Sequence, residues 1–221
     1  MQHISMIGQC GNGQLRALSI HAALILGLFV VAPGVSKAGD GSRLYAPCVV
    51  CHAPQGWGAL DGSIPSLAGQ QQRYLEKQID VFESGARIDS AMQLVAEHPH
   101  FGSHQDVVDV SRYLSALQAN PNPVKGPGKN LIAAMETYEH ICAACHGFDG
   151  NGNSANRVPR IAGQQYPYLA RRIRQAAQLH MNLAPPEMAG ALRGMGEGEK
   201  DALADYLARA GNPAVPDSGL R

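Results

Sequence analysis

The chain has 221 residues, of which 45% are hydrophobic and 16% are charged, a composition that excludes a disordered protein. Its 18 Lys plus Arg balance 18 Asp plus Glu, giving a formal net charge of +0, so general nucleic-acid binding is not expected. Only 5% of the residues are aromatic, beside 25 Gly and 14 Pro, which favours a fold with much loop or a large non-protein group in its core. The length predicts one or two domains.

The first 38 residues have the pattern of a secretory signal peptide. An apolar run over 17–32 follows Arg16, and small residues at Ser36 and Ala38 precede a predicted cleavage after Ala38. A retained membrane anchor is the alternative, although a run of about 16 residues is shorter than the ~20 that a bilayer span needs. Cleavage predicts export to the periplasm and leaves four cysteines in the exported chain, with peripheral membrane association still open.

These four cysteines form two C-x-x-C-H motifs, Cys48 to His52 and Cys142 to His146. The motif is the attachment pattern of c-type haem. Two cysteines on one helical turn point the same way and can form thioethers to one porphyrin, and the histidine that follows can bind the iron. The sequence therefore predicts two covalently attached haem c groups, with His52 and His146 as iron ligands.

Three other uses of the cysteines explain the motifs less well. Disulfides within C-x-x-C would close very small loops and stabilise little. A four-thiolate zinc site gives no reason for a histidine after both second cysteines. A thioredoxin-like redox pair would need a β-α-β context, and no strand-like alternation flanks either motif.

The two motifs belong to a duplicated unit. Cys48 and Cys142 lie 94 residues apart, and the segment Ala68–Gln71 recurs as Ala162–Gln165 at the same offset. Further pairs at this offset or one residue less are Pro65 and Pro159, Tyr74 and Tyr168, Ile79 and Ile173, and Tyr113 and Tyr206. The repeat predicts two domains of about 90 residues, each folded around one haem.

Each unit is expected to be helical. A short helix should carry each C-x-x-C-H motif, and amphipathic helices are expected near 70–84 and 165–180. Closing helices are expected near 103–117, with Ser103 at its start, and near 197–210, with Glu197 at its start. The segment 120–129 is rich in Pro and Gly and predicts a semi-stiff linker. The expected domains are thus 1–38 (signal peptide), 39–119 (domain 1), 120–129 (linker), 130–211 (domain 2) and 212–221 (tail).

The C-x-x-C-H motifs do not specify the sixth ligand of each iron. In the second unit Met188 is the first candidate, because Pro185 and Pro186 are expected to hold its segment extended, while Met181 and Met195 are expected to pack in the core or a loop. In the first unit Met92 is the only methionine. It is followed by a loop rich in histidine, and one of these histidines is the alternative ligand for a bis-histidine iron of lower potential: His98, His100 or His104.

The sequence resembles the two-haem cytochrome c4 family of bacterial periplasmic electron carriers. The resemblance rests on C-x-x-C-H, then Pro-x-Leu/Ile-Ala-Gly-Gln with a tyrosine four or five residues on, a methionine and a closing helix with Tyr-Leu, all present twice over roughly 40–210. It implies an all-α fold of two class I cytochrome c domains that face each other about a pseudo-twofold axis. It also implies that the carbonyls of Pro65 and Pro159 orient the haem histidines. Four further residues are implied to bind haem propionates or to form the domain interface: Gln70, Tyr74, Gln164 and Tyr168.

The resemblance predicts single-electron transfer and no enzymatic activity. The expected partners are electron donors and acceptors such as a membrane cytochrome complex, a terminal oxidase or a periplasmic dehydrogenase. A cytochrome subunit or dedicated electron acceptor of such a dehydrogenase is the first alternative, and a two-haem enzyme is the second. Such an enzyme would need a labile or unusual ligand at one iron.

Overall fold

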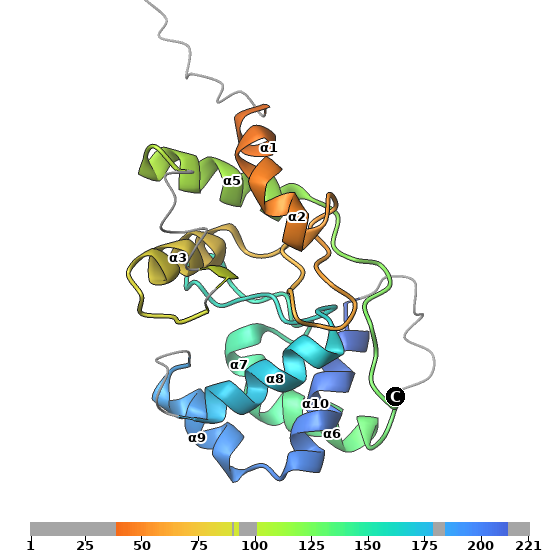
Figure 1. Ribbon diagram of the computed structural model, residues 1–221. Coiled ribbons are helices and arrows are strands. Elements are labelled where there is room, and N and C mark those ends of the chain that lie inside the picture. The colour runs from red at the N-terminus through yellow and green to blue at the C-terminus, as the bar shows by residue number, and fades with distance from the viewer. Residues whose placement is uncertain (1–38, 90, 93–100, 179–183, 212–221) are drawn as a thin grey trace, which may run out of the picture. The chain divides into compact units, whose positions relative to one another are not determined.

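The structure, a computed structural model, describes residues 39–89, 91–92, 101–178 and 184–211 (Figure 1). These residues form helices and loops, with one isolated β-bridge between Asn153 and Val158, so the predicted all-α fold is confirmed. The predicted signal peptide and the tail after Gly211 lie outside the described residues. Within the described ranges, no helix has the length and apolar character needed to cross a membrane.

The first domain packs around helix α5 (His104–Ala116), on which both α1 (Gly39–Tyr45) and α3 (Gln72–Glu83) lie (Figure 1). The short helix α2 (Val49–His52) carries the end of the first C-x-x-C-H motif. The buried core consists of residues from α1, α3 and α5: Leu44, Tyr45, Leu75, Val110 and Leu114. Because the apolar stripe of α3 faces this core, its sequence periodicity predicts its orientation correctly.

The second domain repeats this plan with one more described helix. Helix α10 (Glu197–Arg209) packs on α6 (Leu131–Thr137) and α8 (Tyr166–Ala177), and α9 (Pro186–Gly194) packs on α8 (Figure 1). The short helix α7 (Ala143–His146) carries the end of the second motif. The buried core of the second domain is rich in alanine, and these small side chains let the helices approach closely.

The two closing helices begin at the predicted places because their first turns are capped. The Ser103 hydroxyl accepts a hydrogen bond from the Asp106 amide at 3.4 Å, and the Asp106 carboxylate accepts one from the Ser103 amide at 3.1 Å. At the start of α10, the Glu199 carboxylate accepts a hydrogen bond from the Gly196 amide at 2.7 Å. Such pairs satisfy amides that have no partner within the helix.

The linker is fastened to the second domain. The buried carboxylate of Asp205, whose residue is 1% exposed, accepts hydrogen bonds from the amides of Gly126 at 2.8 Å and Gly128 at 2.6 Å. The same carboxylate pairs with the guanidinium of Arg209 at 2.8 Å, and Arg209 also donates to the Gly126 carbonyl at 2.9 Å. The linker is therefore held against the second domain by specific polar contacts.

Replacing Asp205 by alanine is expected to lower the free energy of unfolding by about 3 kcal/mol, because the amides of Gly126 and Gly128 and the Arg209 guanidinium lose a buried acceptor. Denaturant unfolding of the haem-loaded protein measures this loss. Asp201→Ala is the control, since Asp201 forms a half-exposed ion pair with Arg174 and its loss should cost about 1 kcal/mol or less. Equal losses in the two variants would contradict the anchoring role of Asp205.

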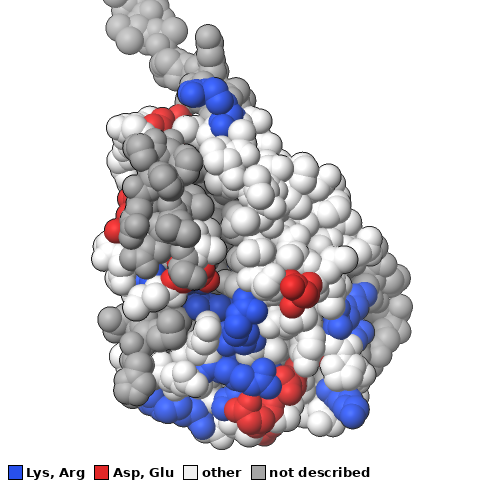
Figure 2. Space-filling model, in the orientation of Figure 1, with Lys and Arg blue, Asp and Glu red and all other residues white. Residues whose placement is uncertain are grey.

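The charges are unevenly divided between the domains. Residues 39–119 contain five Lys plus Arg and nine Asp plus Glu, whereas residues 130–211 contain eight of each kind. On the face drawn in Figure 2, most of the Lys and Arg side chains lie over the second domain. The first domain therefore has net negative charge and the second is balanced before any cofactor charge is added.

Candidate haem sites and domain interface

Both haem-motif histidines are buried and held in the same way. His52 is 5% exposed and His146 is 7% exposed. Nδ1 of His52 lies 3.1 Å from the carbonyl oxygen of Pro65, and Nδ1 of His146 lies 3.2 Å from that of Pro159. Because a carbonyl oxygen can only accept, Nδ1 carries the proton and Nε2 keeps the lone pair that iron ligation needs. These contacts are the ones that the resemblance implies for the two prolines.

The electrostatic surroundings favour the same neutral imidazoles. Burial lowers the pKa of His52, and it also lowers the pKa of His146, while the proline carbonyls act in the opposite direction. A neutral imidazole is the form that binds iron. The residues present therefore fit haem c, which when bound supplies a one-electron couple between ferric and ferrous iron.

Two glycines keep open the space around the proline carbonyls. Gly58 and Gly152 have φ of +72° each. A Cβ at Gly58 would lie 2.5 Å from the Pro65 oxygen, and a Cβ at Gly152 would lie 2.4 Å from the Pro159 oxygen. Any side chain would thus strike the acceptor that orients the histidine, so both positions require glycine.

One tyrosine in each domain forms a hydrogen bond to the backbone next to the haem motif, a role that sequence reasoning missed. The Tyr45 hydroxyl donates to the Ala53 carbonyl at 2.7 Å, and the Tyr138 hydroxyl donates to the Gly147 carbonyl at 2.5 Å, in each case one residue after the haem histidine. Tyr45 also contacts the ring of Tyr113 in the closing helix, with ring centroids 5.8 Å apart. The sequence repeat could have revealed that Tyr45 and Tyr138 are equivalent, because they lie 93 residues apart.

The second domain accommodates one extra residue between this tyrosine and the first cysteine. Tyr45 precedes Cys48 by three residues, whereas Tyr138 precedes Cys142 by four. The segment Tyr138–Cys142 forms a π-helical turn, while the equivalent segment Ala46–Cys48 is a 3₁₀ turn. A π turn absorbs an inserted residue within a helix, so the tyrosine hydroxyl reaches the same carbonyl in both domains.

The four cysteines are available for thioether formation. Cys48 and Cys142 are half-buried, Cys51 and Cys145 are exposed, and none of the four forms a disulfide. Across the described part of the chain, no group of three or more His, Cys, Asp or Glu could hold a metal ion. The disulfide and zinc alternatives therefore find no support in the described residues.

The structure differs from expectation around Met188. Pro185 is extended, as predicted, but Pro186 begins α9 and places Met188 in its first turn. Proline is suited to the first helical position, because its missing amide would have no partner there. Met188 is partly buried and packs against the core cluster of the second domain, which Cys142 and Met195 also contact. Met181 lies outside the described residues.

The first domain is described less fully at this position. Met92 is half-buried, and its amide donates to the Asp89 carboxylate at 3.3 Å. His98 and His100 lie outside the described residues. His104 is exposed on the first turn of α5.

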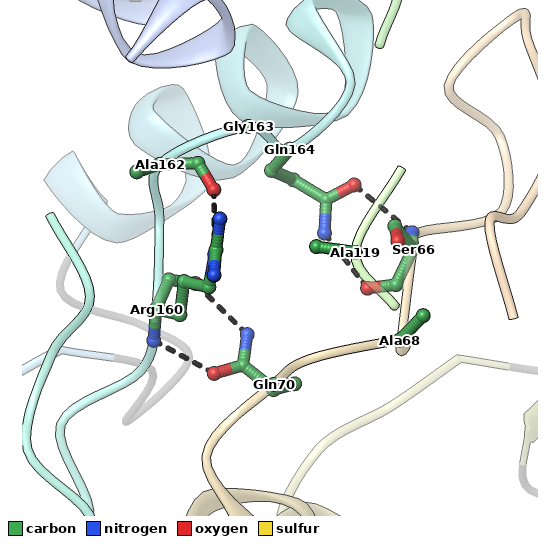
Figure 3. Close-up of a pocket in the computed structure, with 8 residues that line it drawn as sticks. All are labelled: Ser66, Ala68, Gln70, Ala119, Arg160, Ala162, Gly163 and Gln164. Carbon is green, nitrogen blue, oxygen red and sulfur yellow. Dashed lines mark hydrogen bonds between the residues drawn. The ribbon is translucent and has the colours of Figure 1, made fainter. Parts of the chain in front are cut away.

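The domains are joined by two glutamines that occupy equivalent positions in the repeat (Figure 3). The Gln70 side chain donates to the Arg160 carbonyl at 2.8 Å and accepts from the Arg160 amide at 2.7 Å. The Gln164 side chain donates to the Ser66 carbonyl at 2.9 Å and accepts from the Ser66 amide at 2.9 Å. Since Ser66 and Arg160 also differ by 94, the contacts are reciprocal, and they leave a cavity of only about 10 Å³ between the residues drawn.

The next glutamine of each repeat extends this pattern. Gln71 donates to the Asn151 carbonyl at 2.6 Å, and Gln165 donates to the Trp57 carbonyl at 3.1 Å. These acceptors are again 94 residues apart. The repeated Ala-Gly-Gln-Gln segment is thus the symmetric joint between the domains.

The interface is also directly connected to the haem histidines. Pro65, which accepts from His52, is followed by Ser66, whose amide and carbonyl bind Gln164. Pro159 likewise precedes Arg160, which binds Gln70. The carbonyl that accepts from each histidine and the amide that makes the inter-domain contact therefore belong to the same peptide unit.

The two tyrosines that the resemblance singles out lie in one cluster at this interface. The Tyr168 hydroxyl accepts a hydrogen bond from Arg87 of the first domain at 3.4 Å. Burial raises the pKa of Tyr74, and the nearby Tyr168 raises it further. Tyr74 and Tyr168 are thus close to each other and to cationic side chains.

Comparison with protein families assigns each half of the chain to a cytochrome domain. Residues 38–118 match the family described as cytochrome c. Residues 130–207 match the family described as cytochrome c oxidase, cbb3-type, subunit III. The unmatched segment between them contains the fastened linker.

Several proteins similar to this chain are named as cytochromes or as electron acceptors. The chain is 30% identical over 195 residues, 80% of its own length and 88% of the relative, to a thiosulfate dehydrogenase electron acceptor from Stutzerimonas stutzeri (strain A1501). It is 29% identical over 164 residues, 68% of its length and 77% of the relative, to cytochrome c4 from Azotobacter vinelandii.

Solved structures show the same fold. Reduced cytochrome c4 from Pseudomonas stutzeri superposes with a TM-score of 0.68 at 24% identity, with 79% of this chain and 98% of that chain covered. Thiosulfate dehydrogenase from Marichromatium purpuratum superposes with a TM-score of 0.67 at 27% identity, with 79% of this chain and 40% of that chain covered.

Proposed function

Since this chain belongs to the cytochrome c4 family of two-haem electron carriers, we propose that it transfers single electrons between periplasmic redox proteins through two haems with one His and one Met ligand each. The observation that carries the proposal is the pair of buried imidazoles, His52 and His146, each held by a proline carbonyl in the tautomer that ligates iron. We propose the periplasm as the location of the protein because the predicted signal peptide would direct its export.

The arrangement of the chain's residues suits electron transfer better than catalysis. A histidine and a methionine would together hold each iron and leave no position for a substrate, and ligands that stay in place would keep the rearrangement on electron transfer small. The proline carbonyls restrain the imidazoles, and the tyrosine contacts restrain the carbonyls that follow them. We therefore propose that the protein has no enzymatic activity of its own.

Met188 and Met92 are the proposed sixth ligands, and a spectroscopic count tests them. Two haems per chain, each with the full near-infrared band of methionine bound to ferric haem, are the expected result. Half of that intensity would mean that one of the two haems has no methionine ligand. It would also direct mutagenesis to His98, His100 and His104.

Replacing Met188 by leucine is expected to abolish half of that band and to let one ferrous haem per chain bind carbon monoxide at neutral pH, because one axial position loses its ligand. Met195→Leu is the control, since Met195 packs against the same core cluster and should leave both haems closed. Rapid carbon monoxide binding by the unmodified protein would instead favour the two-haem enzyme.

As a second candidate function, we propose that the protein is the electron acceptor of a thiosulfate dehydrogenase. This is favoured by the 30% identity to a thiosulfate dehydrogenase electron acceptor, with 88% of that relative covered. Stopped-flow mixing of the oxidised protein with a thiosulfate dehydrogenase and thiosulfate is expected to reduce both haems within the enzyme's turnover time. Reduction no faster than with thiosulfate alone would exclude this donor and leave the general carrier role intact.

A further inference from the structure

The residue that follows each haem histidine adopts the same backbone conformation in both domains, but only one of the two is glycine. Ala53 has φ of 64° and ψ of 158°. Its repeat partner Gly147 has φ of 78° and ψ of 155°. Glycine adopts this region freely, whereas a residue with a Cβ is strained there. The turn after His52 is therefore strained, and the equivalent turn after His146 is not.

This conformation turns the chain from the haem helix toward the proline that orients the histidine. After the turn in the first domain, the Gly58 amide donates to the His52 carbonyl at 3.0 Å. In the second domain, the Gly152 amide donates to the His146 carbonyl at 2.8 Å. These two glycines are the ones that lie against the proline carbonyls. The position of each histidine acceptor therefore depends on the turn that follows the histidine.

Tyr45 fastens the strained turn. The residue is only 2% exposed, and its hydroxyl donates to the Ala53 carbonyl at 2.7 Å. Burial raises the pKa of this hydroxyl, so it keeps its proton and donates near neutral pH. Since Tyr45 is the last residue of α1 and belongs to the core of the first domain, the contact ties the Ala53 peptide to that core. A strained conformation persists only where its surroundings hold it in this way.

We propose that Tyr45 is a positioning residue that sets the reduction potential of the first haem by holding the strained Ala53 turn, and that Tyr138 has no comparable effect because glycine forms the second turn. Without the Tyr45 hydroxyl, the turn is free to relax, and the Pro65 carbonyl would accept a weaker hydrogen bond from His52. The imidazole would then be a poorer donor to iron, which favours the ferrous state. The inference rests on iron ligation by His52 in the proposed function, and it is independent of the sixth ligand and of the proteins that exchange electrons with the chain.

Spectroelectrochemical titration of the haem-loaded variants Tyr45→Phe and Tyr138→Phe tests the proposal, because phenylalanine removes the hydroxyl and keeps the ring. Tyr45→Phe is expected to raise the reduction equilibrium constant of one haem by about threefold, which is about 30 mV for one electron. Tyr138→Phe is the matched control and should leave both constants nearly unchanged. Equal shifts in the two variants, or no shift in Tyr45→Phe, would overturn the proposal.

Replacing Ala53 by glycine in the Tyr45→Phe background tests whether the strained turn transmits the effect. Glycine adopts this turn without strain, so the double variant is expected to recover the potentials of the unmodified protein. A loss of packing around the Tyr45 ring would not be reversed by a substitution at Ala53. A potential that stays at the Tyr45→Phe value would therefore contradict the proposal.

A stability measurement keeps the proposal testable if Tyr45→Phe does not fold around haem. Ala53→Gly alone is expected to lower the unfolding equilibrium constant by about fivefold, because it removes strain from the native state. Ala116→Gly is the control and should raise that constant by about threefold, since Ala116 is exposed at the end of α5 and glycine disfavours helix. A change in the same direction in both variants would show that the turn is unstrained and would overturn the proposal.

The proposed function is tested separately by carbon monoxide binding to the unmodified ferrous protein. That measurement reports whether a sixth ligand closes each iron, and the Ala53 turn lies on the histidine side. Rapid binding would contradict the proposed ligation, whereas the difference between Tyr45→Phe and Tyr138→Phe would still decide the role of Tyr45.

Discussion

Gly152→Ala is expected to lower the free energy of unfolding by about 3 kcal/mol or more, the largest effect of any single substitution considered. The new Cβ would lie 2.4 Å from the carbonyl oxygens of both Val158 and Pro159, closer than any van der Waals contact, at a residue with φ of +72°. The backbone around Pro159 must therefore move.

The same substitution is expected to raise the reduction potential of the second haem. A displaced Pro159 oxygen accepts a weaker hydrogen bond from His146, which makes the imidazole a poorer donor to iron and favours the ferrous state. Denaturant unfolding combined with a redox titration measures both effects, and Gly58→Ala should reproduce them in the first domain, where the Cβ would lie 2.5 Å from the Pro65 oxygen.

Gly194→Ala is the control for this prediction. A Cβ at Gly194, the last residue of α9, meets nothing within 4 Å. This variant should be as stable as the unmodified protein or slightly more stable, since alanine favours helix over glycine. If Gly152→Ala were equally harmless, the glycine would have no role in positioning the histidine acceptor.

The double substitution Gln70→Ala and Gln164→Ala is expected to destabilise the protein by about 4 kcal/mol, because four inter-domain hydrogen bonds are lost at about 1 kcal/mol each. The amides and carbonyls of Ser66 and Arg160 would also lose their partners. The domains are therefore expected to unfold in two separate transitions, whereas the joined domains unfold together.

Thermal unfolding followed by far-ultraviolet circular dichroism and by haem absorbance measures this separation. Gln72→Ala is the control, since Gln72 only donates to Glu76 one turn along α3 at 2.8 Å and its loss should leave a single transition. A single transition at the unmodified midpoint in the double variant would show that apolar packing, and not the glutamine joint, couples the domains.

The helices were predictable because their determinants are local. The apolar stripe of α3, the capping residue Ser103 and the duplicated C-x-x-C-H motifs can each be recognised within about one helix of sequence. The expected extended conformation of Met188 was wrong for a local reason as well, since the second of two prolines can begin a helix.

The structural roles of Tyr45 and Tyr138 could not be derived in the same way. Each hydroxyl reaches a carbonyl eight or nine residues away, and in the second domain a π turn is needed to preserve the contact. The repeat offset pairs the two tyrosines, but it does not reveal what they bind.

The sequence by itself determined the cofactor, the number of domains and the family, because haem attachment and duplication are encoded in residue types at fixed spacing. Only the tertiary structure decided how the two halves are joined. The backbone groups of Ser66 and Arg160 that bind the glutamines leave no trace in residue type, and the hydrogen bond from Arg87 to Tyr168 joins positions that the repeat does not relate. Contacts to the backbone and between unrelated positions depend on how the chain folds back on itself, which residue spacing along the sequence does not specify.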